Sequence, residues 1–160
     1  GRGKSHIAGA IAHQLIDQYE VTVLYRQLST LLEMRHSAYD FGSQDNAGQK
    51  FRAAHQELLD VDMLILDEVC VNETVLKKNS QSWLGNLLRQ RLVNKKNCIL
   101  ITNHNLGDLE QALGRYCFES IKEYDTYKVR FSGPSRRKGL TLDEEDQVTS
   151  APRYQPNQVR

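Results

Sequence analysis

Short apolar segments alternate with amphipathic helices along this 160-residue chain, and the alternation predicts an α/β fold with a parallel sheet. Two of the segments, residues 61–68 and 98–103, are apolar runs that end in polar residues. Such runs are typical of strands that helices cover on both faces, and right-handed crossovers would join them. The length corresponds to about one domain.

Residue spacing defines the elements before the first of these runs. Ile7, Ala10, Ile11 and Leu15 share one helical face, whereas residues 21–25 are short and rich in β-branched side chains. Thr30 stands three residues before Glu33, the spacing of a capping box at the start of a helix. The expected elements are a helix over 7–16, a strand over 21–25, a helix over 30–39, a loop over 40–46 and a helix over 47–60.

The rest of the chain continues the alternation and then changes in composition. The expected elements are a strand over 61–68, a loop over 70–80, a helix over 83–92, a strand over 98–103, short helices over 106–113 and 118–123, and a last, less buried strand over 127–131. From Asp143 onward an acidic run precedes Ser, Pro, Gln and Asn, with few apolar residues. We therefore expect a folded domain over 1–142 and a disordered tail over 143–160.

Charge and cysteine content restrict the class of protein. Lys and Arg total 21 against 20 Asp and Glu, a net charge of +1, so any contact with nucleic acid must come from a local patch. Three scattered cysteines cannot form a disulfide framework, which favours a reducing compartment. No apolar run approaches the roughly 18 residues that cross a bilayer. We expect a cytoplasmic protein that does not enter membranes.

Gly3, Lys4 and Ser5 lead directly into the first helix, like the end of a phosphate-binding loop G-x-x-x-x-G-K-[ST]. Glycine lets backbone N–H groups approach phosphate oxygens, the lysine would reach the β- and γ-phosphates, and the serine hydroxyl would bind Mg²⁺. The alternative is an ordinary turn and helix cap. Since the loop's start is absent, we expect part of a longer chain. The candidate nucleotide-binding residues here are Gly1, Arg2, Gly3, Lys4, Ser5 and His6.

Polar residues at the ends of the two apolar strands strengthen this interpretation. Asp67 and Glu68 end the first run in a Walker B pattern, where Asp67 would hold Mg²⁺ and Glu68 would polarise the attacking water. Thr102 and Asn103 end the second run, and Asn103 could orient that water. Carboxyl ends of parallel strands meet at one edge, where ligands bind. Together the three features predict a site for ATP and Mg²⁺.

These motifs resemble those of the AAA+ ATPases, and within them the DnaC-type helicase loaders and their IstB-type relatives. The resemblance covers residues 1 to about 140, and its matching segments are 3–8, 61–68, 101–103, 113–115 and 135–137. It implies a P-loop NTPase with a three-layer architecture and a parallel sheet of strand order 5-1-4-3-2, whose first strand would precede Gly1. Proteins of this branch bind ATP and single-stranded DNA and deliver a replicative helicase to its template.

The chain departs from the family at the arginine finger. The family usually carries G-E-R-x-x-x-R after the sensor strand, but here Tyr116 and Ser120 stand where the two arginines are expected. Arg115 is our candidate for the finger, and the alternative is a surface arginine. Because a finger can contribute roughly 10³- to 10⁵-fold in rate, we expect slow hydrolysis. Arg137 aligns with the family's sensor-2 arginine, and the alternative is a basic linker.

A contact with single-stranded DNA needs cations near aromatic side chains. Arg35 and Tyr39 lie on the helix where the resemblance places such contacts. For any one of these residues, a solvated helix face is the alternative. A basic track for DNA could continue from this pair through further cations, namely Arg26, Arg52, Arg89, Arg91, Lys95 and Lys96.

Three functions remain open at this point. The first is an ATPase with weak, DNA-stimulated hydrolysis that loads a hexameric replicative helicase onto single-stranded DNA. The second is an IstB-type transposition helper with the same ATPase core. The third is a nucleotide-dependent DNA adaptor that hydrolyses little ATP. The resemblance also implies self-association through the ATPase interface.

Overall fold

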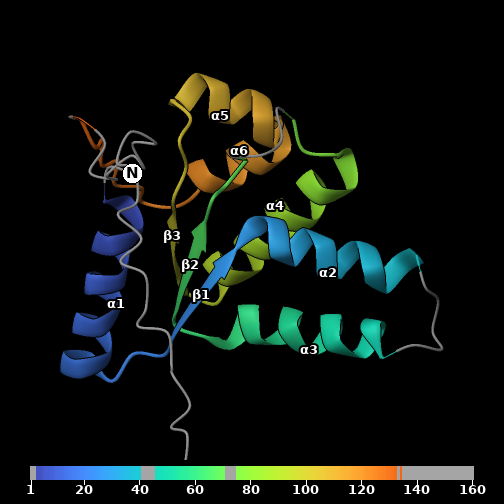
Figure 1. The fold of residues 1–160 in the computed structure, drawn as a ribbon, viewed down its shortest axis with the longest axis horizontal. Helices are drawn as coiled ribbons and strands as arrows, with labels where there is room; N and C mark the ends of the chain where they lie inside the picture. The colour runs from blue at the N-terminus through green and yellow to red at the C-terminus, as the bar shows by residue number, and fades with distance from the viewer. Residues whose placement is uncertain (1–2, 41–45, 71–74, 133, 135–160) are drawn as a thin grey trace, which may run out of the picture.

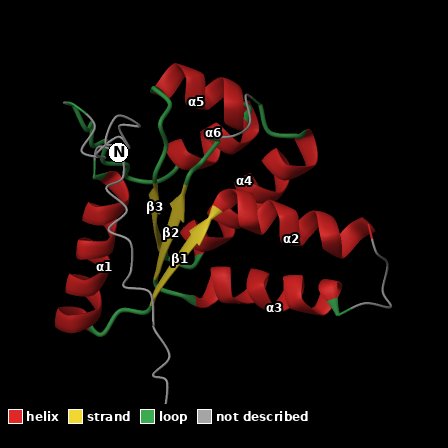
Figure 2. Cartoon of the chain, viewed as in Figure 1, coloured by secondary structure: helices red, strands yellow, loops and turns green. Residues whose placement is uncertain are grey.

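The computed structural model describes residues 3–40, 46–70, 75–132 and 134 (Figure 1). Helices and strands alternate as expected, and Figure 2 shows the strands at the centre of the molecule with helices around them. In chain order the elements are α1 (Lys4–Tyr19), β1 (Val23–Gln27), α2 (Leu28–Asp40), α3 (Ala47–Asp60), β2 (Met63–Asp67), α4 (Lys78–Val93), β3 (Asn97–Leu100), α5 (Leu106–Leu113) and α6 (Arg115–Lys122).

The strands form a parallel sheet of order β1-β2-β3. Met63 at the start of β2 pairs with Val23 on one side and Asn97 on the other, so the three strands begin almost level. All three arrows in Figure 1 point toward the end of the sheet near α5 and α6. The predicted α/β class with a parallel sheet is confirmed. In the five-stranded order implied by the resemblance, these are the neighbouring strands 2, 3 and 4.

Alternating side chains of the strands pack against two helical layers. Leu24, Leu64 and Leu66 join the larger core, which α2, α3, α4, α5 and α6 complete. On the opposite face Ile65 packs with Ala8 of α1. Figure 1 accordingly shows α1 on one side of the sheet and α2, α3 and α4 on the other. Both faces of β2 are therefore covered, which explains its continuous apolar sequence.

Four helices begin earlier than expected: α1 and α6 by three residues, α2 by two and α4 by five. α2 begins at Leu28, directly after β1, so Thr30 lies inside the helix and does not start it. Leu28 and Leu31 are both about 1% exposed, and burying them favours helix from that point. α4 begins at Lys78, within the expected loop, and buries Ser80 four residues before Leu84.

Residues 127–131 do not form the expected last strand. Tyr127 and Val129 are 87% and 76% exposed. Alternation of side chains favours a strand only where a neighbour supplies ladder hydrogen bonds, and in the described part of the chain no strand pairs with this segment. The same described part contains no helix that is long and apolar enough to span a membrane.

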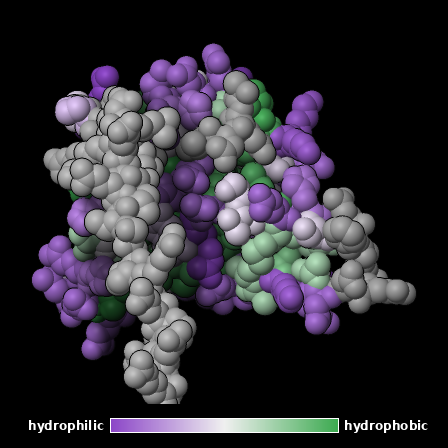
Figure 3. All heavy atoms as spheres, in the orientation of Figure 1, coloured by the Kyte–Doolittle hydropathy of each residue, from purple (hydrophilic) through white to green (hydrophobic). Residues whose placement is uncertain are grey.

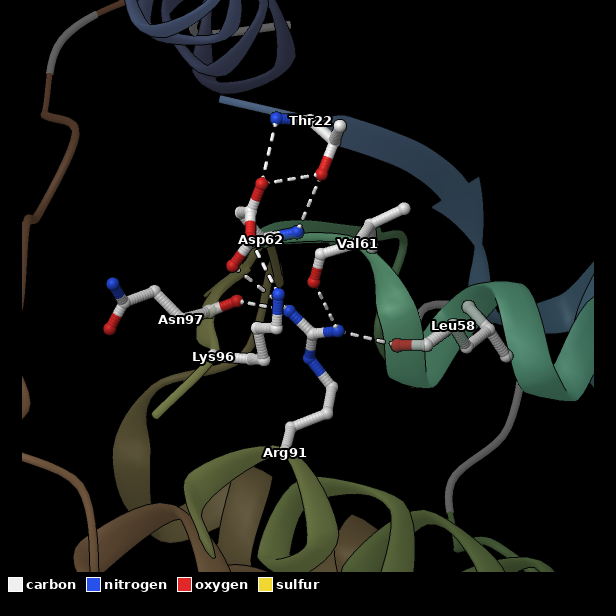
Figure 4. A network of polar contacts seen from close by, with 7 residues as sticks. All are labelled: Thr22, Leu58, Val61, Asp62, Arg91, Lys96 and Asn97. Carbon is white, nitrogen blue, oxygen red and sulfur yellow. Dashed lines mark hydrogen bonds and ion pairs between the residues drawn. The ribbon is translucent and has the colours of Figure 1, made fainter. Parts of the chain in front are cut away.

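A polar network holds the amino ends of the strands together (Figure 4). Its centre is Arg91 of α4, which is fully buried. Its guanidinium donates hydrogen bonds to four main-chain carbonyl groups on three segments of the chain, those of Leu58, Val61, Asp62 and Asn97. Arg91 therefore joins the end of α3 to the starts of β2 and β3.

The side chain of Asp62 extends this network to the start of β1. Its carboxylate accepts hydrogen bonds from the Thr22 N–H and hydroxyl groups and lies 2.5 Å from Lys96 Nζ. The hydrogen bond from Lys96, followed by those from Thr22, holds the pKa of Asp62 well below its usual range. All three strands are thus tied at the end of the sheet opposite their carboxyl ends.

Candidate nucleotide-binding site

The described part of the predicted phosphate loop, from Gly3 onward, lies where α1 begins, beside the carboxyl end of the sheet (Figure 1). Gly3 precedes the helix with a φ of 84°, a left-handed conformation that glycine adopts without steric cost. Lys4 and Ser5 are the first two residues of the helix, so their side chains lie at its positive N-terminal end. This geometry suits an anion such as a phosphate group.

Two hydrogen bonds connect this helix start with the ends of the strands. Ser5 Oγ donates to Asp67 Oδ2 at 2.5 Å, and Lys4 Nζ donates to Asn103 Oδ1 at 2.6 Å. Asp67 is the last residue of β2, and Asn103 follows β3. Motifs separated by 62 and 99 positions in sequence therefore lie in direct contact.

Asp67 is only 4% exposed, and hydrogen bonds occupy both of its carboxylate oxygens. Oδ1 accepts from the Glu68 N–H at 2.7 Å, and Oδ2 accepts from Ser5 Oγ and from the Tyr25 hydroxyl. Burial, followed by the hydrogen bond to Asp67, raises the pKa of Tyr25. A buried carboxylate with this many donors is well oriented.

Tyr25 is a site residue that no sequence motif indicates. Alternation along β1 places it on one face of a strand, but the pairing of β1 with β2 decides which residue it meets. In the observed register Tyr25 pairs with Ile65, two residues before Asp67 on the same face. The only signal in the sequence is a tyrosine at the centre of a short strand, between Leu24 and Arg26.

The residues at this site fit a magnesium ion. Ser5 Oγ and Asp67 Oδ2 are adjacent oxygen atoms of the kind that Mg²⁺ prefers. Within the described ranges, no group of three or more His, Cys, Asp or Glu side chains comes together to form a cage for a metal ion. Mg²⁺ commonly uses one or two protein oxygens together with phosphate oxygens and water, which is what this site could provide.

Glu68 follows Asp67 with a backbone conformation that is unusual for its residue type. Its φ is 55°, and Cys70 has a φ of 61°, both in the left-handed region. The Glu68 side chain is partly exposed, and it makes no hydrogen bond or ion pair with any other residue that the structure describes. Such backbone outliers cluster at functional sites.

Hydrogen bonds hold the segment after Glu68 against the loop between β3 and α5, which carries Asn103. Val69 N donates to the Ile101 carbonyl at 2.9 Å, and Thr102 Oγ1 donates to the Val69 carbonyl at 2.9 Å. A ring nitrogen of His104 lies 2.7 Å from the Cys70 carbonyl oxygen. The backbone beyond Asp67 and the loop that carries Asn103 are therefore linked directly.

The remaining predicted nucleotide-site residues are not part of this group of contacts. His6 is exposed on α1, and Arg115 is exposed at the first position of α6. Gly1, Arg2 and Arg137, together with the expected tail over 143–160, lie outside the described residues.

Tyr116 and Ser120, which replace the family's two arginines, pack against α4. The Tyr116 hydroxyl donates to Asn86 Oδ1 at 2.6 Å, and Ser120 is buried. A Cβ atom on Gly85 would lie 2.8 Å from the Tyr116 ring, so the glycine permits the close approach of the two helices. Both positions serve helix packing in this chain.

The predicted DNA-contact residues Arg35 and Tyr39 form a pair on α2, with the Arg35 guanidinium 5.0 Å from the centre of the Tyr39 ring. α2 extends from the end of β1 away from α1 (Figure 1). Figure 3 shows mainly hydrophilic residues on the viewed face, with less polar residues gathered over α2 and α3.

The structure contradicts one part of the proposed basic track. Arg91 is fully buried and occupied by main-chain carbonyl groups, so it cannot contact DNA. Arg26 is paired with Glu57 and Arg89 with Glu123. A surface position is the expectation for Arg91 from sequence, because arginine is seldom fully buried unless it is paired.

The parallel sheet and its surrounding helices have the fold of AAA+ P-loop domains. The chain belongs to the IstB-like ATP binding proteins, because the model of that family matches residues 1–120. The resemblance to the IstB and DnaC branch is thereby confirmed. Among curated proteins, none matches the chain.

Solved structures show the same fold. Domain III of the replication initiation protein DnaA from Thermotoga maritima has a TM-score of 0.60 and 17% identity, covering 75% of this chain and 47% of that one. AMPPCP-bound DnaA from Aquifex aeolicus has a TM-score of 0.59 and 18% identity, covering 75% and 35%. A DnaC helicase loader has a TM-score of 0.59 and 22% identity, covering 77% and 69%. The chain thus spans about a third to a half of these DnaA structures.

Proposed function

We propose that this protein binds ATP with Mg²⁺ at the start of α1 and uses it to load a replicative helicase onto single-stranded DNA, with slow hydrolysis. The observation that carries the nucleotide site is the convergence of Lys4, Ser5, Asp67 and Asn103 through two hydrogen bonds. Membership of an ATP-binding family supports the same ligand. The structural likeness to a protein named as a helicase loader supports the cellular role.

Each side chain has a distinct role in the proposed site. Lys4 and the N-terminus of α1 bind the phosphate groups, and Ser5 and Asp67 hold the metal ion. When bound, Mg²⁺ would neutralise negative charge on the phosphates. Glu68 has no competing partner among the described side chains, so its carboxylate can orient a water molecule for attack. Asn103 is placed beside Lys4 to assist at the terminal phosphate.

Slow hydrolysis is proposed because the two expected finger positions hold side chains without charge. Tyr116 and Ser120 contact α4, and neither side chain has a positive charge that could reach a nucleotide on a neighbouring subunit. Arg115 is exposed and could act in their place at an interface between copies of the chain. The same features support the third function, a nucleotide-dependent DNA adaptor. Such an adaptor would be controlled by ATP binding more than by ATP hydrolysis. Self-association through the ATPase interface is part of the proposal.

Binding of a fluorescent ATP analogue to the full chain tests the nucleotide site. Lys4→Ala should weaken binding about tenfold or more, because it removes a charge-assisted contact to phosphate. Lys95→Ala, at an exposed lysine after α4, is the matched control and should bind as the wild type does. If Lys4→Ala and the wild type bound the analogue equally, the proposed site would be wrong.

The family match also favours a second function, that of an IstB-type transposition helper. Loading assays on circular single-stranded DNA distinguish the two roles. ATP-dependent transfer of a hexameric replicative helicase onto the circle would support the loader. Stimulation of transposase strand transfer, without helicase loading, would support the helper. Arg35 and Tyr39 are the proposed DNA contacts, because they join a cation to an exposed aromatic ring.

A further inference from the structure

Tyr25 is the one side chain of β1 that reaches the candidate metal ligand Asp67. It lies on the face of the sheet that α1 covers, the same face as Ile65 and Asp67. From a position level with Ile65, its hydroxyl extends along the sheet and donates to Asp67 Oδ2. Tyr25 is 41% exposed, so tight core packing does not explain its placement.

The carboxylate of Asp67 has one oxygen turned toward α1, and that oxygen receives two hydroxyl groups. Oδ1 is held by the N–H group of Glu68, which leaves Oδ2 for Ser5 and Tyr25. Ser5 is itself a proposed ligand of Mg²⁺, so its hydroxyl must serve the metal when a nucleotide binds. Tyr25 is not a proposed metal ligand. Its hydroxyl can therefore hold the Asp67 carboxylate both with and without bound nucleotide.

We propose that Tyr25 is a positioning residue of the nucleotide site, whose hydroxyl orients the Asp67 carboxylate for a magnesium-complexed nucleoside triphosphate. The proposal rests on the proposed function and adds to it a residue outside the Walker motifs. A hydrogen bond that fixes a metal-ligating carboxylate acts on metal affinity, since the ligand no longer has to be oriented on binding. It should have little effect on nucleotide that binds without metal.

The test is a titration of the full chain with a fluorescent ATP analogue, once with Mg²⁺ and once with EDTA. Tyr25→Phe removes only the hydroxyl, whereas Asp67→Asn removes the carboxylate charge. Tyr19→Phe, at an exposed tyrosine at the far end of α1, is the matched control. A thermal melt of each variant shows that it is folded.

We expect Tyr25→Phe to reduce the Mg²⁺-dependent gain in affinity about tenfold, as loss of a hydrogen bond to a metal ligand commonly does. Its affinity in EDTA should stay within about twofold of the wild type. Asp67→Asn should abolish the gain, and Tyr19→Phe should retain it. This split between the two conditions is a result that a purely structural role for Tyr25 would not produce.

Three results would overturn the proposal. The first is an unchanged Mg²⁺-dependent gain in Tyr25→Phe, and the second is an equal loss of affinity with Mg²⁺ and with EDTA. Either would leave the proposed function intact, because the wild type would still bind nucleotide. The third is a wild type that gains nothing from Mg²⁺, which would also remove Asp67 as a metal ligand. A wild type that binds no nucleotide would overturn the proposed function itself.

Discussion

Three elements of the site meet at the carboxylate of Asp67. Ser5 comes from α1, Tyr25 from β1, and Asp67 itself ends β2. The side chain is buried, and its negative charge is offset by three hydrogen-bond donors. A carboxylate held in this way is preorganised for a cation, because its orientation does not have to be found when the ligand binds.

Substitution of Glu68 tests its proposed role in ATP hydrolysis. Glu68→Gln keeps the size of the side chain and removes the general base, so we expect ATP turnover to fall by at least about 100-fold while nucleotide binding is retained. Phosphate release by the full-length protein measures the first quantity, and the titration described above measures the second. Glu110→Gln, at an exposed position of α5, is the control. Unchanged turnover in Glu68→Gln would remove Glu68 from the catalytic role.

His55 makes folding stability depend on pH. It packs against Phe51 and Trp83, with ring centres 6.0 Å apart in each pair, and burial lowers its pKa. Because the folded pKa lies below the unfolded value of about 6.5, protonation favours the unfolded chain. This contribution to stability is present above about pH 6.5 and is lost as the pH falls through the folded pKa.

The measurement is the free energy of unfolding in urea between pH 7 and pH 5. The wild type should lose more stability over this range than His55→Gln, which cannot take up the proton. Equal losses in the two proteins would show that His55 is not the group responsible.

At the scale of elements, Arg91 joins α3, α4, β2 and β3 at the amino ends of the strands (Figure 4). Arg91→Met keeps much of the side-chain volume but leaves buried carbonyl groups without donors. We expect a loss of about 3 kcal/mol in the free energy of unfolding, measured by chemical denaturation.

Two further variants define the cause of that loss. Arg91→Lys keeps the charge but lacks the planar fork of donors, so it should restore only part of the stability. Arg52→Met, at an exposed position of α3, should change stability by less than about 0.5 kcal/mol. A loss in Arg91→Met no larger than in Arg52→Met would contradict the role given to the network.

Element prediction succeeded where the signal was local and failed where it depended on neighbours. α3, α5 and β2 follow from periodicity and apolar runs, because those patterns are determined by the face that each element buries. Residues 127–131 alternate in the same manner, yet they form no strand without a pairing partner. Thr30 and Glu33 have the spacing of a capping box, but burial of Leu28 starts the helix earlier.

In the molecule as a whole, the two ends of the sheet have different roles: one stabilises the fold and the other carries the candidate site. Arg91 and Asp62 tie the amino ends of the strands into a rigid base. At the carboxyl ends, the connections leave the sheet and present Asp67 and Asn103 to the start of α1. This arrangement is general for open parallel sheets, whose ligands bind beyond the carboxyl ends of the strands.

The fold class and most of the candidate site could be predicted from the amino-acid sequence. Lys4, Ser5, Asp67 and Asn103 occur in short motifs whose chemistry depends on residue type, and their places at element ends follow from local periodicity. Only the tertiary structure decided that Tyr25 reaches Asp67 and that Arg91 is buried. Both depend on how distant segments pair and pack, and no local pattern contains that information because strand register is set by contacts across the whole sheet.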